Sequence, residues 1–355
     1  MTHETDLQQM IASVTRPDAA FATAAWERLD SLTKPPRSLG RVEELAATMA
    51  VIQHAVRPVA GPMAIVLMAG DHGVVAEGVS PYPQEVTWQM VANFSAGGAA
   101  INQLAGHIGA RLVLVDVGIA GDVSGIDGVR HAKGRAGTRN MAEEPAMTRE
   151  EAAAALLVGV NVARELATAG VRLIGTGEMG IGNTTAAAAL TAAYAQVDPA
   201  VVVGRGTGLD DAGVSHKAVV VERALQVNDV ASQDALGVLA AVGGLEIAGL
   251  AGVFIGAAAA GVAVVSDGFI SGAALLAATR MCPACAGFAF PSHRSVEPGH
   301  TVVLEALGMD PVLEFDMRLG EGTGAALAMG VIDAACKIMS GMATFGDAGV
   351  SDRED

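Results

Sequence analysis

The sequence contains few cysteine, aromatic and basic residues for its length. Three cysteines among 355 residues are too few for the disulfide framework of a small secreted protein. Aromatic residues make up 3% of the chain, which argues against a binding module lined by aromatic rings. Because 38 acidic residues oppose 22 basic ones, the net charge of −16 repels nucleic acid and anionic membranes. A bound phosphate would therefore need local donors, such as backbone N–H groups or one well-placed Lys or Arg.

The cysteines and histidines also lack the spacing of a metal site. Cys282 and Cys285 form a C-x-x-C pair, but no second such pair and no His pair accompanies it in the sequence. We interpret the pair as a loop feature. Residues 292–300 hold two histidines and a glutamate without a recognised metal-ligand spacing. We therefore predict neither a metal site nor a resident cofactor.

Apolar residues and glycine, in contrast, are abundant. Hydrophobic residues make up 51% of the chain and 44 residues are Gly, which indicates a large core of buried strands and closely packed helices. The first sixteen residues are polar and include Glu4 and Asp6, unlike a secretory signal peptide. Residues 235–265 are apolar enough to suggest a membrane helix, but Glu246 and the many Gly and Ala residues favour a buried helix followed by a buried strand. We expect a soluble, cytoplasmic protein.

Short apolar runs that end abruptly in Gly, Asp or Glu recur along the chain and alternate with helical patterns. Strands without polar alternation, separated by helices, are typical of a parallel sheet covered by helices on both faces. We therefore predict a Rossmann-like α/β fold, in which ligands bind at the carboxyl ends of the strands. The predicted strands are residues 63–68, 112–117, 173–174, 201–203, 262–265 and 312–315.

The two ends of the chain show helical patterns instead. Apolar residues at helical spacing cover residues 19–30 and 38–56, and a further helix is predicted at 323–342, after the last strand. We predict that residues 1–60 and 325–345 form a small helical domain and that residues 61–324 form a large α/β catalytic domain. Residues 346–355 are polar and acidic, and we predict a frayed tail there.

The segment GTGEMGIGNTT, residues 175–185, leaves a predicted strand and enters an alanine-rich helix. In this context the N–H groups at the start of a helix bind phosphate. From Gly177 the segment matches the P-loop spacing, but Asn183 replaces the lysine, which argues against ATP or GTP and suits a monophosphate. The alternative is a glycine-rich turn with Asn183 or Thr184 as the helix cap. Lys217 is a candidate phosphate partner, although a lone lysine is more often a solvated surface residue.

A second glycine-rich segment, MRLGEGTG at residues 317–324, follows the last predicted strand. It suggests that Glu321 is an exposed carboxylate against an apolar wall that includes Leu319. A carboxylate beside apolar side chains has a raised pKa and suits a general base near neutral pH. The alternative is that Glu321 only caps the helix that begins at Thr323. Glu178, in the first glycine-rich segment, is a second candidate, and the two carboxylates could face one substrate.

The polar loop at residues 70–89 places Tyr82 between two prolines and also contains Trp88. A rigid loop that holds an aromatic ring near Ser80 and Gln89 could clamp a flat heteroaromatic ligand. A role as a lid or an interface fits the same residues equally well. His72 in this loop is a possible catalytic acid, but we favour a hydrogen-bonded structural histidine.

Taken together, these motifs resemble those of one family, the nicotinate-nucleotide–dimethylbenzimidazole phosphoribosyltransferases of the CobT type. The stretch MCPAC at residues 281–285 is unlike the family pattern, but it lies between the motifs. The matching stretches occur in order and are GDHG (70–73), GVSPYPQEVT (78–87), NF (93–94), GGAAIN (97–102), GEMGIGNTT (177–185), GRGTG (204–208), SDGFI (266–270), SHRSVEPGH (292–300) and LGEGTGA (319–325).

The resemblance implies a function. Members transfer the phosphoribosyl group of nicotinate mononucleotide to 5,6-dimethylbenzimidazole, which gives α-ribazole 5′-phosphate and nicotinate during assembly of the lower ligand of cobalamin. The resemblance also implies a large domain with a parallel sheet, a small domain of N- and C-terminal helices, and a homodimer with its sites near the subunit boundary.

The resemblance further assigns residues by matching position. Glu321 would be the general base, and Glu178 a second carboxylate near the ribose and the base. The benzimidazole pocket would be lined by Ser80, Tyr82, Gln89, Met179 and Leu319. The nucleotide and its phosphate would be surrounded by Gly180, Ile181, Gly182, Asn183, Gly206, Lys217 and Ser295.

Two other functions fit part of the pattern. A nucleotide-binding regulatory protein would use the phosphate-binding turn but would leave the glycine-flanked carboxylates without a role. A phosphotransferase of the P-loop type would lack the lysine and an obvious carboxylate for Mg²⁺. Release of nicotinate from nicotinate mononucleotide in the presence of dimethylbenzimidazole distinguishes these three hypotheses.

Overall fold

A six-stranded, entirely parallel sheet forms the centre of the protein in the computed structural model, which describes residues 2–351. The strand order is β3-β2-β1-β4-β5-β6, so the chain starts in the middle of the sheet and builds outward on both sides. This confirms the predicted parallel α/β fold. The strands are β1 (Met63–Gly70), β2 (Arg111–Gly118), β3 (Val129–His131), β4 (Leu173–Met179), β5 (Ala263–Ser266) and β6 (Ala289–Pro291).

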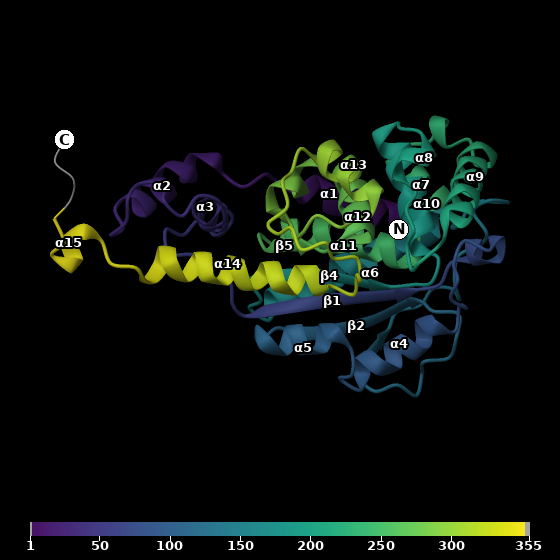
Figure 1. Ribbon diagram of the computed structural model, residues 1–355, viewed down its shortest axis with the longest axis horizontal. Coiled ribbons are helices and arrows are strands. Elements are labelled where there is room, and N and C mark those ends of the chain that lie inside the picture. The colour runs from purple at the N-terminus through teal and green to yellow at the C-terminus, as the bar shows by residue number, and fades with distance from the viewer. Residues whose placement is uncertain (1, 352–355) are drawn as a thin grey trace.

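Helices connect the strands and surround the sheet (Figure 1). Short 3₁₀ segments include η2 (Gly73–Glu77) and η4 (Pro283–Phe288). The α-helices are α1 (His3–Ser13), α2 (Ala22–Asp30), α3 (Arg41–Gln53), α4 (Val86–Ser95), α5 (Ala100–His107), α6 (Arg149–Thr168), α7 (Asn183–Ala195), α8 (Pro199–Val202), α9 (Asp211–Val227), α10 (Ala235–Val242), α11 (Leu245–Ala259), α12 (Phe269–Met281), α13 (Pro298–Leu307), α14 (Thr323–Gly341) and α15 (Phe345–Ala348).

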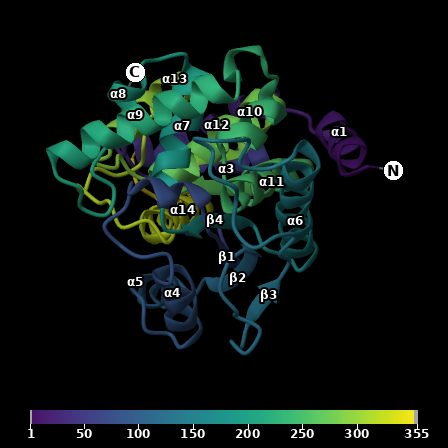
Figure 2. The ribbon, with the colours of Figure 1, turned by 90° about the vertical axis from the view of Figure 1, so that its right-hand side faces the viewer.

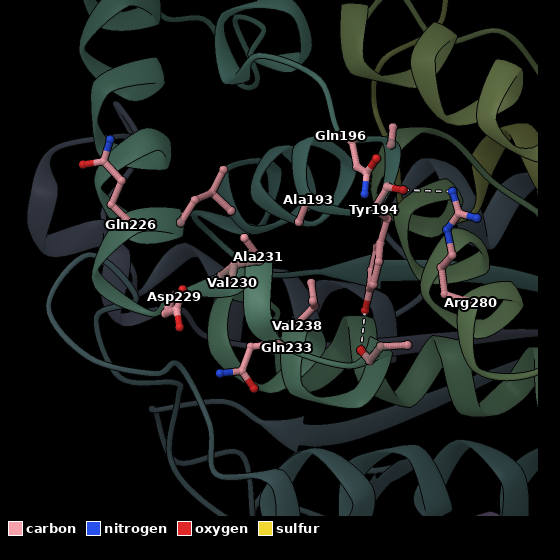
Figure 3. A pocket seen from close by; sticks show the side chains of 13 residues that line it. Ala193, Tyr194, Gln196, Gln226, Asp229, Val230, Ala231, Gln233, Val238 and Arg280 are labelled. Carbon is pink, nitrogen blue, oxygen red and sulfur yellow. Dashed lines mark hydrogen bonds between the residues drawn. The ribbon is translucent and has the colours of Figure 1, made fainter.

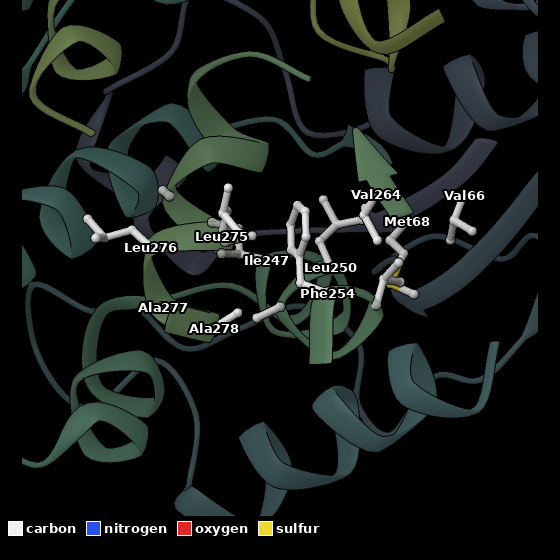
Figure 4. Packing of buried hydrophobic residues seen from close by; sticks show 14 of the residues in the cluster. Val66, Met68, Ile247, Leu250, Phe254, Val264, Leu275, Leu276, Ala277 and Ala278 are labelled. Atoms are coloured by element: carbon white, nitrogen blue, oxygen red, sulfur yellow. The ribbon is translucent and has the colours of Figure 1, made fainter. Parts of the chain in front are cut away.

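The two faces of the sheet are covered by different helices. Successive side chains of a strand point to opposite faces. In β1, Met68 lies against Gly249 of α11, whereas Ile65 points to the other face and lies against Gly322, just before α14. Figure 4 shows Met68 and Val66 beside Leu250 and Phe254 in this core. α14 shares its face with α5, and α11 is covered in turn by α6 and α12.

The glycines of α11 explain how the helices on that face pack so closely. A Cβ atom on Gly159 of α6 would lie 1.8 Å from the carbonyl oxygen of Gly249. Likewise, a Cβ atom on Gly252 would lie 1.9 Å from the carbonyl oxygen of Leu156. Only glycine allows the two backbones to approach to this distance. The close helix packing predicted from the Gly-rich and Ala-rich composition is therefore confirmed.

The N-terminal and C-terminal helices meet beside the sheet. α2 and α3 lie with the C-terminal half of α14, away from the strands (Figure 1). Arg28 of α2 ties them together by donating hydrogen bonds to the carbonyl oxygens of Met339 and Met342, at 3.1 and 2.9 Å. α1 instead packs against α6 and α11 (Figure 2). The division into domains at residues 1–60, 61–324 and 325–345 stays a prediction.

Several elements differ from those that the sequence predicts. Residues 201–203 are not a strand: Asp198 caps a short helix whose first residue is Pro199, and this start signal outweighs the β-branched valines. Residues 312–315 form only an isolated bridge between Leu313 and His293. The short strands β3 and β6 and the helix α1 were not predicted. Of the predicted frayed tail, residues 345–348 form the helical turn α15, and residues 352–355 lie outside the described part of the chain.

Among the described residues, α14 is long and apolar enough to cross a membrane by length and composition alone. Half of its most apolar window is nevertheless buried inside the protein, as in a core helix. Residues 235–265 form α10, α11 and β5, with a break at Gly243 and Gly244. The stretch is buried and ends in a strand, as predicted, but it contains two helices where the sequence predicts one.

Candidate active site

A cavity of about 430 Å³ opens at the carboxyl ends of β4, β5 and β6. β4 pairs with β1 at the point where the strand order reverses, which is where ligands bind in open parallel sheets. Every site residue predicted from the sequence lines this cavity except Gln89. They are Ser80, Tyr82, Glu178, Met179, Gly180, Ile181, Gly182, Asn183, Gly206, Lys217, Ser295, Leu319 and Glu321.

Glu321 lies in a turn of unusual backbone conformation just before α14. Gly320, Glu321 and Gly322 have φ values of 82°, 64° and 89°. This left-handed conformation is easy for glycine but strained for glutamate, so the surrounding structure must hold Glu321 in place. The N-cap position of α14 belongs to Gly322, which argues against the interpretation of Glu321 as a helix cap.

The carboxyl group of Glu321 is more enclosed than the sequence suggests. Only 7% of the residue is exposed, so the expectation of an exposed carboxylate is wrong. Burial, followed by the negative charge of Asp267, raises the pKa of Glu321 to about 7. A carboxylate with this pKa can take up a proton near neutral pH, as a general base must.

Glu178 reaches the same cavity from the end of β4. The strand continues through the glycine-rich segment to Met179, which places Glu178 at its carboxyl end. Its Oε1 accepts a hydrogen bond from the backbone N–H of Glu321 at 3.5 Å, and its other oxygen accepts one from Asn183. Burial raises the pKa of Glu178 to about 8, and the charges of Asp267 and Glu246 act in the same direction. The two predicted carboxylates therefore meet in one site.

A helix start and a buried cation also line the cavity. Gly182, with φ of 94°, forms the N-cap of α7, so the first turn of that helix faces the cavity. Lys217 of α9 is 1% exposed and donates a hydrogen bond to Thr184 Oγ1 at 2.6 Å. Burial lowers the pKa of Lys217 to about 8, against the opposing effect of Glu297. The interpretation of Lys217 as a solvated surface residue is wrong.

Apolar side chains form the remaining walls. Val79, Val86 and Met90 come from the loop after β1 and from α4, and Phe269 comes from the start of α12. Ser80 Oγ accepts a hydrogen bond from the backbone N–H of Tyr82 at 3.2 Å, which fixes the bend of that loop. A flat apolar ligand can lie between these walls.

Two residues that the sequence singled out in the loop at 70–89, Gln89 and His72, do not line the cavity. Gln89 is exposed because α4 turns Val86 and Met90 towards the cavity instead. The structure therefore does not bring Gln89 to the predicted pocket. His72 is buried and its Nε2 hydrogen-bonds to Glu246 Oε1 at 2.7 Å, behind Gly180. The predicted hydrogen bond of His72 is confirmed, and its structural role stays a prediction.

The cavity also contains charged residues that sequence reasoning did not assign. Asp267 follows β5, His293 follows β6, and Glu297 and Arg318 line the same space. Asp267 is 1% exposed. For Asp267 the available signal was a polar residue directly after a buried strand.

A larger groove of about 950 Å³ lies elsewhere on the molecule, between α7, α9 and α10 (Figure 3). None of the predicted site residues lines it. Its most prominent polar groups are already paired: Tyr194 donates to the carbonyl oxygen of Ala235 at 2.7 Å, and Arg280 donates to that of Tyr194 at 2.8 Å. The smaller cavity at the strand ends is therefore the better candidate for catalysis.

The chain is also similar to known proteins over nearly its full length. Residues 14–350 match the model of a family described as phosphoribosyltransferase. The nicotinate-nucleotide–dimethylbenzimidazole phosphoribosyltransferase of Chloroflexus aggregans is 51% identical to this chain, over 98% of the chain and 99% of the relative. The enzyme of the same name from Geobacter metallireducens is 50% identical over the same shares. The crystal structure of CobT from Thermus thermophilus, 48% identical, covers 94% of this chain and 99% of its own with a TM-score of 0.90.

Proposed function

The chain belongs to the nicotinate-nucleotide–dimethylbenzimidazole phosphoribosyltransferase family, and from this premise we propose how its cavity performs the reaction. The protein is a phosphoribosyltransferase that moves the phosphoribosyl group of nicotinate mononucleotide to 5,6-dimethylbenzimidazole. The products are α-ribazole 5′-phosphate and nicotinate, in the assembly of the lower ligand of cobalamin. The observation that carries the proposal is one cavity that is lined both by two neighbouring carboxylates and by a buried cation beside a helix start.

The phosphate of the nucleotide binds at the start of α7. The backbone N–H groups of the first helical turn and the positive end of the helix dipole attract an anion. Lys217 adds a positive charge, and its attraction for an anion is stronger in a buried site than in water, while Thr184 orients its ammonium group. This local arrangement overcomes the repulsion expected from a net charge of −16.

The sugar then lies between the phosphate and the carboxylates. The bond between ribose C1 and the pyridinium nitrogen breaks, and its electron pair neutralises that nitrogen, so that nicotinate leaves. The transition state at C1 resembles an oxocarbenium ion, as in glycoside cleavage. A benzimidazole nitrogen attacks C1 from the opposite face, which converts the β-nucleotide into an α-riboside.

Glu321 accepts the proton that the other benzimidazole nitrogen loses. With a pKa of about 7, its carboxylate is half ionised near neutral pH and can take up this proton. Glu178, whose pKa is about 8, is mostly protonated at the same pH and can donate a hydrogen bond to the ribose or the base. The apolar walls hold the benzimidazole ring against C1, and this orientation supplies much of the rate.

We expect the purified protein to release nicotinate only when both substrates are present, and to do so equally well in EDTA. The leaving group departs with its own electron pair and needs no metal to neutralise pyrophosphate. Among residues 2–351, no group of three or more His, Cys, Asp or Glu side chains is arranged to hold a metal ion. Chromatography of nicotinate and α-ribazole 5′-phosphate measures the rate. Loss of activity in EDTA that a divalent ion restores would contradict the metal prediction, and no nicotinate release would contradict the function.

We propose that the protein works as a homodimer in the cytoplasm, and exposed apolar side chains near the cavity support the dimer. Tyr82 and Leu319 line the cavity, and Val296 and Phe315 lie in the segments that carry its lining residues Glu297 and Arg318. These four apolar side chains are 49–61% exposed, which is unusual for large hydrophobic groups. A second copy of the chain that covers them would close the site against water.

The dimer predicts a mass of about twice 35.7 kDa in sedimentation equilibrium. Phe315→Lys should shift this mass towards the monomer, because a charge at the interface would have to be buried without a partner. A wild-type protein that stays monomeric at micromolar concentration would contradict the dimer.

A further inference from the structure

Asp267 uses both of its carboxylate oxygens on the backbone around Glu321. It follows β5, and its own N–H donates to Thr176 Oγ1 of β4 at 3.2 Å. Oδ2 accepts the N–H of Gly322 at 3.1 Å, and Oδ1 accepts the N–H of Ala325 at 2.9 Å. These two N–H groups belong to the N-cap and first turn of α14, so a negative charge is also favourable there.

These hydrogen bonds fasten the residue that directly follows Glu321. The turn of Gly320, Glu321 and Gly322 has left-handed backbone throughout, which glutamate adopts only when its surroundings compel it. On the other side the turn is packed against β4, because a Cβ atom on Gly177 would lie 2.6 Å from the carbonyl oxygen of Glu321. The carboxylate of Asp267 and the backbone of β4 thus hold the turn from two directions.

We propose that Asp267 is a positioning residue for the proton transfer: through its hydrogen bonds to the N–H groups of Gly322 and Ala325, it holds the Glu321 turn in its strained conformation. The inference rests on the proposed function, because it presupposes that Glu321 is the base. It adds a residue from the end of a further strand, β5, to a site otherwise built on Glu321 and Glu178.

The charges around Glu321 also link it to Asp267. After burial, the charge of Asp267 is the next cause that raises the pKa of Glu321, and it acts on Glu178 in the same way. Asp267 itself is buried, which raises its pKa, whereas His293 and the backbone N–H groups oppose that rise. The other charged groups that face this cluster around the cavity are Lys217, Glu297, Arg205 and Arg318, with Glu246 behind β4.

Replacement of Asp267 by a neutral residue should change the pH dependence of the rate. A neighbouring negative charge raises the pKa of a carboxyl group, so its removal lowers the pKa of Glu321. Glu321 then stays ionised to lower pH. The acidic limb of the pH–rate profile, which follows the ionisation of the base, should therefore move to lower pH.

Asp267→Asn tests the proposal because it removes the charge and one of the two acceptors with little change in volume. We expect kcat for nicotinate release to fall by roughly 10- to 100-fold, as for a misplaced catalytic group. The acidic limb should move down by about one pH unit. Asp71→Asn is the matched control: Asp71 is also a buried carboxylate at a strand end, accepts the N–H of Ala120 at 2.7 Å and lies outside the cavity lining. It should lower the melting temperature and leave the limb in place.

Two further variants make the result decisive. Asp267→Glu keeps the charge but misplaces the acceptors, so kcat should fall while the limb stays near its wild-type position. In a Glu321→Gln background, Asp267→Asn should lower kcat only a little further, because the effects of replacing residues that act as one unit are not additive. Asp267 is only structural if the acidic limb of the pH–rate profile does not move in Asp267→Asn. The same conclusion follows if Asp267→Asn lowers kcat by the same factor in the wild-type and Glu321→Gln proteins. The assignment of Glu321 as the general base has its own test, because it is wrong if Glu321→Gln alone leaves the acidic limb of the pH–rate profile intact.

Discussion

Glu321→Gln should lower kcat for nicotinate release by roughly 10²–10⁴-fold, the usual contribution of a general base. Glutamine has the size of glutamate and can still accept a hydrogen bond from a ring N–H, but it cannot take the proton. The Michaelis constants for both substrates should change little. Steady-state kinetics with each substrate varied in turn separates these effects.

The pH profile gives an independent measure of the same residue. Because the pKa of Glu321 is raised to about 7, its ionised fraction grows as the pH rises through 7. The wild-type rate should therefore increase between about pH 6 and pH 8, and the Glu321→Gln variant should lack this limb. Glu314→Gln is the matched control, since Glu314 is exposed and pairs with Arg294 on the surface. A near wild-type rate in Glu321→Gln would move the role of base to Glu178, whose pKa is also raised.

The sequence predicts the parallel sheet well because its buried strands carry a local signal. β1 and β5 are short apolar runs that are each followed by an aspartate, and such runs are detectable without knowledge of their neighbours. An apolar run is misleading, however, where neighbouring residues favour the start of a helix. The valines at 201–203 look like a strand, but Asp198 and Pro199 begin a helix there.

The site was predictable only in part, because burial and pairing depend on distant segments. Glu178 and Glu321 stand out between glycines in the sequence, yet nothing local shows that both are enclosed by the same wall. Lys217 looks like a surface lysine until α9 packs against α7. Asp267 is a single carboxylate after a strand, and its partners Gly322 and Ala325 lie 55 and 58 residues further along the chain. Contacts between residues so far apart in the sequence form only when the chain folds, so the local sequence does not reveal them.

Lys217→Met should raise the Michaelis constant for nicotinate mononucleotide by roughly 10- to 100-fold and leave that for dimethylbenzimidazole nearly unchanged. A charge-assisted hydrogen bond to an anion contributes about 1.5–3 kcal/mol, which sets this range. Methionine keeps the length and the apolar stem of the lysine side chain. A carboxylate placed at the N-cap of α7 by Gly182→Asp would also repel the phosphate, but Lys217→Met is the sharper test of the phosphate site. A Cβ atom on Gly182 would lie 2.8 Å from Val75 Cγ2, and its φ of 94° disfavours any side chain.

The pH dependence should identify the lysine charge as the cause. With the pKa of Lys217 lowered to about 8, the free protein loses this charge as the pH rises through 8. The ratio kcat/KM for the nucleotide, which reports the free enzyme, should therefore fall above pH 8 in the wild type. Lys217→Met should lack this basic limb, and Lys217→Arg should keep its charge and shift the limb beyond the accessible range. Lys337→Met, at an exposed lysine of α14, is the matched control. If Lys217→Met weakens the binding of both substrates equally and lowers the melting temperature, the lysine stabilises the fold rather than the bound phosphate.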